Sequence, residues 1–558
     1  MFLLFATLLS VALSGNGLNV QSQMLLMPYP KSLAFNYLGT TSLIATSTVK
    51  MSLSSNCQND INCLAFMQSN FNHTITYPLQ VQSGIKDFRI SLFSVIDIPH
   101  ITPGSTTTLS TINIYLTAPI YFPTLKIGID EDYQLSATSS GVTITASNAY
   151  GARHGLETLI QLFRPLESKS GSFAISQLPI TISDSPRFKW RGLMLDCARN
   201  PLSKETFVKV INSLAAVKAN VLHLHLTDGQ TFVFESKEYP NLSAKGAYDQ
   251  NKVLTQKFLQ QLSEYGRSRG VIVYPEIDIP AHAASWNLGY PGVVADCWST
   301  IKTWRYGENI PALNPTNDTT FKILEALFQR ELPNVFGNDY VHIGGDEMVM
   351  TAWEDAVEYS DIQKWMSANG ISTLLGLESY FNKYAQDKVM ASGKTPVAWE
   401  EVYKKGNADK STIVEVWSDI SLLKKAVDDG YKAIWSAGFY LDMQRPLASQ
   451  SEHHMWVWTN RDFYANDPTS SFTAAELENV LGGEGCSWHE SVDDANVIER
   501  IFQRYNAIAE RLWSAKSMTN AESLEVRADY VRCLGQRRGF MRSAGPLYAS
   551  YCQLPEEK

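Results

Sequence analysis

The stretch Tyr340-Val341-His342-Ile343-Gly344-Gly345-Asp346-Glu347 joins a short apolar run to two consecutive carboxylates through a pair of glycines. In a regular strand, neighbouring side chains point to opposite faces, so Asp346 and Glu347 could not both serve one site. Glycine tolerates backbone angles that other residues resist, so the chain can leave strand geometry here and turn both acids inward. An acid pair at the carboxyl end of a buried strand is typical of a (β/α)8 barrel enzyme. An exposed acidic turn without a catalytic role is the alternative.

The chain after Pro186 continues this pattern, because short apolar runs alternate with amphipathic helices. In the helix that follows Ser203, apolar residues recur at the spacing of one helix face, for example Phe207, Val210 and Ile211. Together the runs predict a (β/α)8 TIM barrel over residues 186–558. Its eight predicted strands are 192–195, 221–226, 271–277, 340–343, 395–398, 413–416, 432–435 and 480–483.

A smaller α+β domain is predicted for residues 18–185, ahead of the barrel. This region is rich in Ser, Thr, Ile and Val, and alternating runs such as Thr111 to Leu116 and Val142 to Thr145 indicate strands. One helix stands out around Ala149 to Leu162, with Leu156, Leu159 and Ile160 on one face.

The first residues indicate export. Residues 1–17 combine an apolar run with small and polar residues after it, which predicts a signal peptide. That run is too short to span a bilayer, and no later apolar run is long enough, so no membrane span is expected. Three Asn-x-Ser/Thr sequons, at Asn72, Asn241 and Asn317, fit an exported glycoprotein. We therefore expect the secretory pathway, with a lysosomal or secreted destination.

Composition and cysteine content agree with an exported globular protein. The 558 residues are 44% hydrophobic, and a formal charge of -9 argues against nucleic acid as a partner. Two plausible disulfides join Cys57 to Cys63 and Cys533 to Cys552, among seven cysteines. The remaining three are interpreted as buried thiols: Cys197, Cys297 and Cys486.

Nearly every predicted barrel strand ends in groups able to do chemistry, at the face that such barrels use for catalysis. One such ending would be unremarkable because loops are polar, but eight in succession favour an enzyme. The endings are Asp196 and Arg199; His225 and Asp228; Glu276, Asp278 and His282; Asp346 and Glu347; Trp399, Glu400 and Glu401; Trp417; Tyr440 and Asp442; and Trp488, His489 and Glu490.

Tryptophan faces combined with acids that bind hydroxyls are how a pyranose is held, and glycoside hydrolysis needs a carboxylic acid to protonate the leaving oxygen. A metal-dependent amidohydrolase is the competing interpretation, with His223, His225, His282 and Asp346 as ligands. The further histidines expected on the fifth and sixth strands are missing, so we predict neither a metal nor another cofactor.

The order of motifs resembles the β-N-acetylhexosaminidases of glycoside hydrolase family 20 over nearly the whole chain. A lone Gly-Gly-Asp-Glu would be weak support for this resemblance, but many motifs in order are strong support. The matching segments are 130–135, 151–158, 190–192, His225 with Asp228, 275–278 with His282, 342–347, 440–442 and 488–490.

The resemblance implies a retaining hydrolysis of terminal β-linked N-acetylhexosamine, in which the substrate's own acetamide is the nucleophile. It implies that Glu347 is the general acid and base, and that Asp346 orients the acetamido N–H. Tyr440 would donate a hydrogen bond to the acetamido oxygen. Asp228 and His282 would set the orientation and pKa of Glu347.

For binding of the sugar, the resemblance implies an aromatic wall of Trp399, Trp417 and Trp488. Hydroxyl groups would be bound by Arg191, Asp442 and Glu490, although Arg191 could instead be a structural ion-pair partner. The family also suggests a homodimer, or a heterodimer with a related subunit. A carbohydrate-binding coat protein without turnover is the alternative, but a lectin needs no general acid. The expected partner is in either case a carbohydrate.

Overall fold

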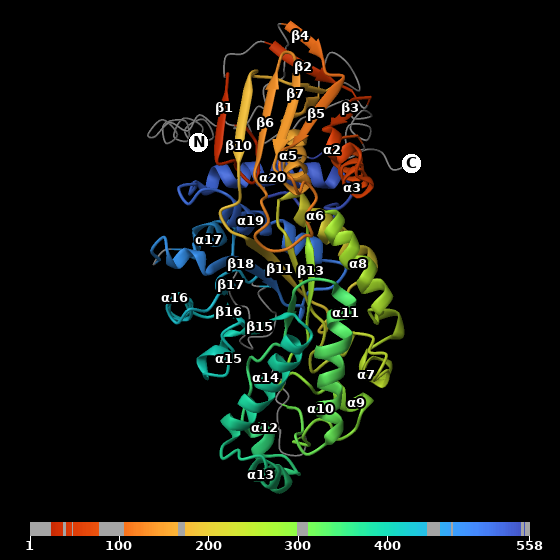
Figure 1. Ribbon diagram of the computed structural model, residues 1–558, viewed down its shortest axis with the longest axis vertical. Coiled ribbons are helices and arrows are strands. Elements are labelled where there is room, and N and C mark those ends of the chain that lie inside the picture. Colours follow the sequence, from red (N-terminus) through yellow and green to blue (C-terminus); the bar gives the residue numbers. More distant parts are fainter. Residues whose placement is uncertain are drawn as a thin grey trace, which may run out of the picture.

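The computed structural model describes residues 24–36, 41–46, 48–76, 105–165, 173–297, 311–442, 458–469, 472–547 and 552. An N-terminal domain built on β-sheets lies at one end of the molecule, and a barrel surrounded by helices forms the rest (Figure 1). The predicted signal peptide lies outside the described residues.

The barrel is closed and consists of eight parallel strands, as predicted. All but the first residues of two strands are buried, because helices cover the outer surface of such a barrel and side chains fill its interior. In chain order and in spatial order the strands are β11 (Trp190–Asp196), β12 (Val221–His225), β13 (Ile272–Glu276), β14 (Tyr340–His342), β15 (Thr395–Trp399), β16 (Ile413–Val416), β17 (Ala433–Trp435) and β18 (Val480–Ser487).

Helices follow the strands around the barrel. The helix predicted after Ser203 is confirmed as α6 (Lys204–Ala216). The others are α7 (Asn241–Gly246), α8 (Gln256–Ser268), α9 (Trp286–Gly289), α10 (Asp318–Glu325) with its continuations η4 (Ala326–Glu331) and α11 (Leu332–Phe336), α12 (Thr351–Glu354), α13 (Tyr359–Ala368), α14 (Leu374–Ala391), α15 (Glu400–Lys404), α16 (Ile420–Asp428), α17 (Asn460–Ala465), α18 (Val497–Phe502), α19 (Tyr505–Trp513) and α20 (Ala521–Arg537), with short 3-10 turns η3 (Gln250–Lys252) and η5 (Glu476–Glu478).

Within its described residues, the N-terminal domain contains two sheets and three α-helices. A six-stranded sheet has the order β1 (Ser32–Phe35), β10 (Ile180–Asp184), β6 (Tyr133–Thr138), β7 (Gly141–Ala146), β5 (Thr111–Leu116) and β3 (Lys50–Leu53). A four-stranded sheet has the order β4 (Ser105–Thr108), β2 (Thr41–Ala45), β9 (Phe173–Ile175) and β8 (Arg164–Pro165). The helical segments are α2 (Ser55–Gln58), α3 (Ile61–Phe71), η2 (Asn72–Thr76) and α5 (Ala149–Leu162).

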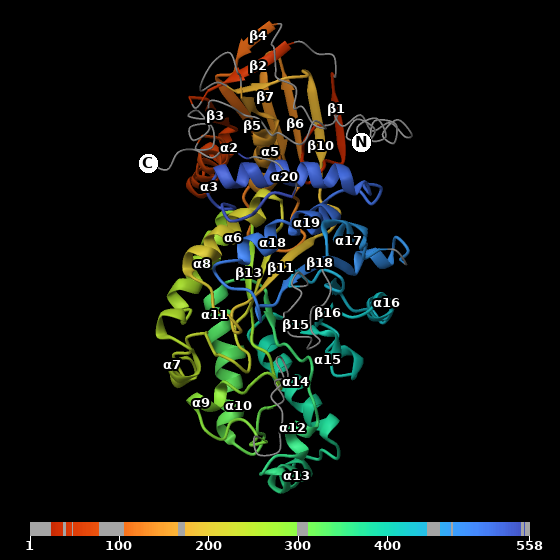
Figure 2. The ribbon, with the colours of Figure 1, turned by 180° about the vertical axis from the view of Figure 1, so that it is seen from behind.

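Helix α5 has the predicted bounds, but it is buried on every side rather than on one apolar face. It lies between the six-stranded sheet and the barrel, so its polar side chains need partners inside the protein. Glu157 accepts hydrogen bonds from both terminal nitrogens of Arg538, at 2.8 and 3.0 Å. Arg538 follows α20, which lies between the two domains in both views of the ribbon (Figures 1 and 2).

Cysteines and sequons are placed largely as expected. Disulfides join Cys57 to Cys63 and Cys533 to Cys552, the two pairs expected from the sequence. Cys197, Cys297 and Cys486 are buried. Among the sequons, Asn72 is exposed, whereas Asn241 and Asn317 are half-buried. Their glycosylation remains a prediction.

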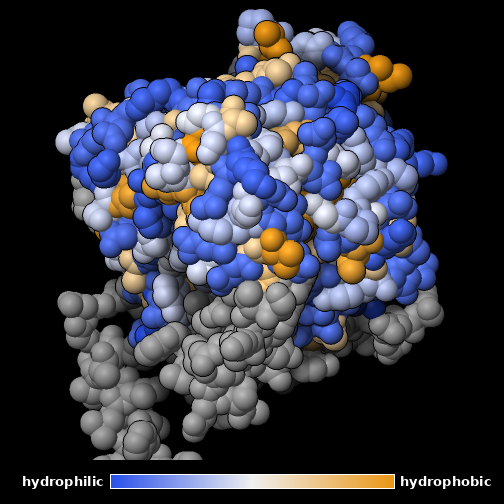
Figure 3. Space-filling model, turned by 90° about the horizontal axis from the view of Figure 1, so that it is seen from below, coloured by the Kyte–Doolittle hydropathy of each residue, from blue (hydrophilic) through white to orange (hydrophobic). Residues whose placement is uncertain are grey.

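None of the helices in the described part of the chain is long and apolar enough to cross a membrane. At the end of the molecule opposite the N-terminal domain, hydrophobic residues form only small, separate groups on a mostly hydrophilic surface (Figure 3).

Candidate active site

The glycine pair after β14 is required by backbone geometry and by close packing. Gly344 and Gly345 have φ values of +67° and +101°, which side-chain-bearing residues rarely adopt. A Cβ on Gly344 would lie 1.7 Å from Oδ1 of Asp278, and one on Gly345 would lie 2.3 Å from Cγ2 of Val402. The inference that this pair lets the chain leave strand geometry is confirmed.

Beyond the glycines, Asp346 is buried beside a second carboxyl group, Asp278. Oxygens of these two residues and a ring nitrogen of His282 all lie within 4.8 Å of one another. Burial and the charge of Asp346 raise the pKa of Asp278 well above its usual value, and burial also raises the pKa of Asp346. Two adjacent buried carboxyl groups cannot both ionise at low cost, so the pair holds a proton. Asp278 also accepts the Gly345 N–H at 2.9 Å, which fixes the turn.

Glu347 has a different environment, because its side chain is 57% exposed. Oε2 of Glu347 lies 3.5 Å from Nε2 of His282. Hydrogen bonding to His282 lowers the pKa of Glu347. Burial alone would lower the pKa of His282, but the Asp228 carboxylate raises it well above its usual value. His282 is therefore a cation that faces Glu347.

Asp228 contacts the ring nitrogen of His282 that does not face Glu347. Its Oδ1 lies 3.2 Å from Nδ1 of His282, and its Oδ2 lies 3.1 Å from Nε2 of His225. Nη2 of Arg199 lies 2.7 Å from the same Oδ2. Burial would raise the pKa of Asp228, but Arg199 and the histidines lower it far below its usual value. The structure thus brings Asp228, His282 and Glu347 together.

The predicted aromatic residues also come together. Trp399 is buried and packs with Met194 and Cys486, and the half-buried Trp417, Trp488 and Tyr440 pack against this cluster. The ring centroids of Trp399 and Trp488 are 6.1 Å apart. Trp417 donates a hydrogen bond from its indole to Glu401 at 3.2 Å.

Arg191 was wrongly predicted to bind sugar hydroxyls. It is the second residue of β11, at the end of the strand opposite the catalytic face, and it is fully buried against the N-terminal domain. Its Nη2 lies 2.6 Å from Oε1 of Glu131, and its guanidinium lies over the ring of Trp513. The structural ion-pair alternative is the correct one.

Arg199, rather than Arg191, lies among the candidate site residues. It follows the carboxyl end of β11, where it lies 3.2 Å from Asp196 and covers the ring of Trp488 at 4.9 Å. The position of Arg199 just after a predicted strand indicated a place at the catalytic face. The motif that contains Arg191 led to that residue instead. Asp278 was likewise present in a matched motif but was not given a role.

Asp442 and Glu490 are close enough for their charges to interact. Asp442 is 3% exposed. Burial raises the pKa of Glu490, whereas Arg199 opposes that rise. Oδ1 of Asp346 and Oε2 of Glu490 have no hydrogen-bond partner within the described residues. Both oxygens can accept hydrogen bonds from the N–H and O–H groups of a ligand.

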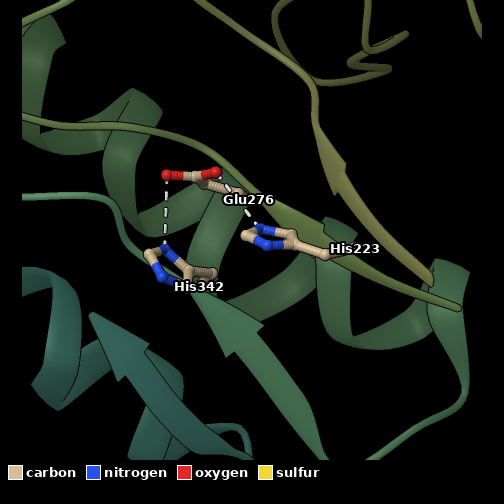
Figure 4. A group of neighbouring side chains, drawn as sticks. All are labelled: His223, Glu276 and His342. Carbon is tan, nitrogen blue, oxygen red and sulfur yellow. Dashed lines mark ion pairs between the residues drawn. The ribbon is translucent and has the colours of Figure 1, made fainter. Parts of the chain in front are cut away.

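Deeper in the barrel, His223, Glu276 and His342 are close enough to hold a metal ion (Figure 4). One ring nitrogen of each histidine already has another partner, however. Nδ1 of His223 lies 2.7 Å from Oε1 of Glu484, and Nδ1 of His342 accepts the Gly344 N–H at 3.0 Å. Contacts of the imidazoles with buried carboxylates and with backbone therefore already hold these side chains in place.

Comparison with known proteins decides the family. Residues 188–516 match the model of the glycosyl hydrolase family 20 catalytic domain. This chain belongs to glycosyl hydrolase family 20. Residues 26–162 match a second model, described as beta-acetyl hexosaminidase like.

Curated relatives and a solved structure agree with the family assignment. The beta-hexosaminidase subunit beta of Entamoeba histolytica is 58% identical over 562 residues, or 99% of both chains. Beta-hexosaminidase subunit A1 of Dictyostelium discoideum is 37% identical over 78% of each chain. The Flavobacterium johnsoniae chitobiase superposes with a TM-score of 0.74 at 30% identity, over 93% of this chain and 74% of that one. The family 20 protein described here is a β-N-acetylhexosaminidase.

Proposed function

We propose that this enzyme removes terminal, non-reducing β-linked N-acetylhexosamine and retains the anomeric configuration, with the substrate's acetamide as the nucleophile. The unequal environments of two adjacent acids support this most. Asp346 is buried next to Asp278, whereas Glu347 is half-exposed next to His282. One acid can therefore face the acetamide while the other reaches the glycosidic oxygen.

Glu347 is the general acid in this proposal. In the free site the His282 cation favours the ionised form of Glu347, and the proton resides on the histidine. A bound sugar excludes water from Glu347, which disfavours the carboxylate and raises its pKa. The proton then passes to Glu347 and on to the glycosidic oxygen as the bond to the anomeric carbon breaks.

The acetamido oxygen attacks the anomeric carbon as that bond breaks, forming a cyclic oxazolinium ion. Asp346 accepts a hydrogen bond from the acetamido N–H and balances the positive charge. Tyr440 donates a hydrogen bond to the acetamido oxygen and holds it in line. Water then attacks the same carbon, Glu347 takes the water proton, and the acetamide is restored. Two inversions at one carbon give net retention.

The sugar ring is bound by the aromatic cluster and by three charged residues. Trp399, Trp417 and Trp488 cover its apolar faces. Arg199 takes the role that was assigned to Arg191 and, with Asp442 and Glu490, binds hydroxyl groups.

Release of nitrophenol from its β-N-acetylglucosaminide and from its plain β-glucoside tests this function. We expect turnover of the first only, and we expect Glu347→Gln to abolish it. Equal cleavage of the two substrates would rule out assistance by the acetamide, and no cleavage of either would favour a carbohydrate-binding protein.

For location and assembly, we propose the secretory pathway and a dimer with itself or a related subunit. The predicted signal peptide, three sequons and two disulfides fit an oxidising compartment. The relatives are described as subunits, which fits a dimer. Gel filtration of the secreted protein tests the dimer. A loss of mass after enzymatic removal of N-linked glycans tests passage through the secretory pathway.

A further inference from the structure

Glu276, the last residue of β13, is a fully buried carboxylate at the centre of the barrel. Its Oε2 lies 2.7 Å from Nδ1 of His225, and its Oε1 accepts the indole N–H of Trp399 at 2.7 Å. His223 and His342 face it from the neighbouring strands at 3.1 and 3.3 Å (Figure 4). One carboxylate therefore contacts both a histidine that leads to the general acid and one of the tryptophans of the aromatic cluster.

From His225 a continuous chain of acids and bases leads outward. Nε2 of His225 lies 3.1 Å from Asp228, Asp228 lies 3.2 Å from Nδ1 of His282, and Nε2 of His282 lies 3.5 Å from Glu347. Every member except Glu347 is buried, so water does not compete for these contacts.

The charges along the chain alternate. Both neighbours of His225 are carboxylates, so both of its nitrogens donate and the ring is a cation. Burial would lower the pKa of His225, but Glu276 and Asp228 raise it to about 10. Without Glu276 as an anion, His225 would lose a negative charge that favours its protonated ring, so it could turn or lose a proton. Asp228 would then hold His282 in a different orientation or protonation state.

We propose that Glu276 is a positioning residue for the general acid. It acts on Glu347 through His225, Asp228 and His282. This inference rests on the proposed role of Glu347. Glu276 itself touches neither the substrate nor the reacting atoms.

The test compares leaving groups in Glu276→Gln, because an activated leaving group departs without a proton. For chitobiose, whose leaving oxygen must be protonated, we expect kcat/KM to fall by about 10- to 100-fold, a part of what general acid catalysis supplies. For the 2,4-dinitrophenyl β-N-acetylglucosaminide we expect a loss of less than about threefold. A purely structural role would lower both rates equally, which would overturn the proposal.

Glu415→Gln is the matched control. Glu415 is another fully buried glutamate of the barrel, on β16, and accepts the hydroxyl of Ser436. Burial raises its pKa well above the usual value, so an amide replaces a neutral carboxyl group. We expect no leaving-group dependence in this variant, and a dependence equal to that of Glu276→Gln would overturn the proposal.

A further variant is needed if Glu276→Gln does not fold. His225→Gln then interrupts the same chain one step later and should show the same leaving-group dependence. If His225→Gln lowers both rates equally, the proposal is overturned. Glu347→Gln must show the dependence if Glu347 is the acid. If it does not, the proposed function fails; if it does while both core variants do not, only the role of Glu276 fails.

Discussion

His282 and Glu347 face each other with both backbones in the left-handed region, at φ +54° and +48°, and with Nε2 and Oε2 3.5 Å apart. Such angles cost a non-glycine residue on the order of 1–3 kcal/mol each, and they persist only where surrounding contacts impose them. Here Asp228 holds the histidine and the glycine turn holds the glutamate. The backbone conformation of two loops therefore fixes the position of Glu347 relative to His282.

Gly345→Ala should disable the site. The new methyl group would meet Val402 and strain a backbone at φ +101°, which displaces both acids. A misplacement near 1 Å can cost about 100-fold in rate, and we expect a loss in kcat of at least that order. Gly430→Ala is the control, since Gly430 has φ +84° but open space around its Cβ. It should cost about 1 kcal/mol in the free energy of unfolding and leave kcat intact. Equal kcat losses in the two variants would contradict the account.

The two arginines should respond differently to substitution. Arg191→Gln leaves Glu131 buried without its cation, so we expect the free energy of unfolding to fall by about 3–5 kcal/mol. The kcat/KM of the folded fraction should not change. Arg199→Gln should lower kcat/KM by about 100-fold or more, because a cationic donor is lost from the site. Urea unfolding and steady-state kinetics of both variants separate the roles, and a KM defect in Arg191→Gln would show that it binds substrate after all.

The contact between the domains should make stability depend on acid pH. Burial would raise the pKa values of Glu131 and Glu157, but Arg191 and Arg538 lower both from 4.5 to about 2. Because the folded pKa is the lower one, this stabilisation is complete above pH 4.5 and is lost as pH falls towards 2. The free energy of unfolding, measured by urea titration across this range, should fall with pH. The fall should be shallower in Glu157→Gln, and an unchanged slope would contradict the assignment.

Dialysis against a chelator should leave activity unchanged. His223, Glu276 and His342 already contact one another, Glu484 or backbone, so we expect none of them to need a metal. Loss of activity on dialysis, restored by zinc or another divalent cation, would revive the metal-dependent alternative.

The sequence predicted the barrel and most of the site, because strand ends in a parallel barrel meet at one face whatever the loops do. The Gly344-Gly345 turn could be predicted because it depends on the backbone freedom of the two glycines themselves. Arg191 was misassigned because its role came from a motif match, although it precedes the predicted strand 192–195 and so lies at the end opposite the catalytic face. The burial of α5 on all sides depends on how the two domains pack, and this packing cannot be predicted from the residue pattern of one helix.

Progressive fluorination of the substrate's acetamide tests the central claim most directly. Each fluorine withdraws electrons from the acetamido oxygen and weakens it as a nucleophile, while the leaving group and the ring hydroxyls stay the same. If that oxygen attacks the anomeric carbon, kcat should fall steeply from the acetamido to the fluoro-, difluoro- and trifluoroacetamido nitrophenyl glycosides. A kcat that stays constant across the series would contradict the account and would point to a nucleophile supplied by the protein.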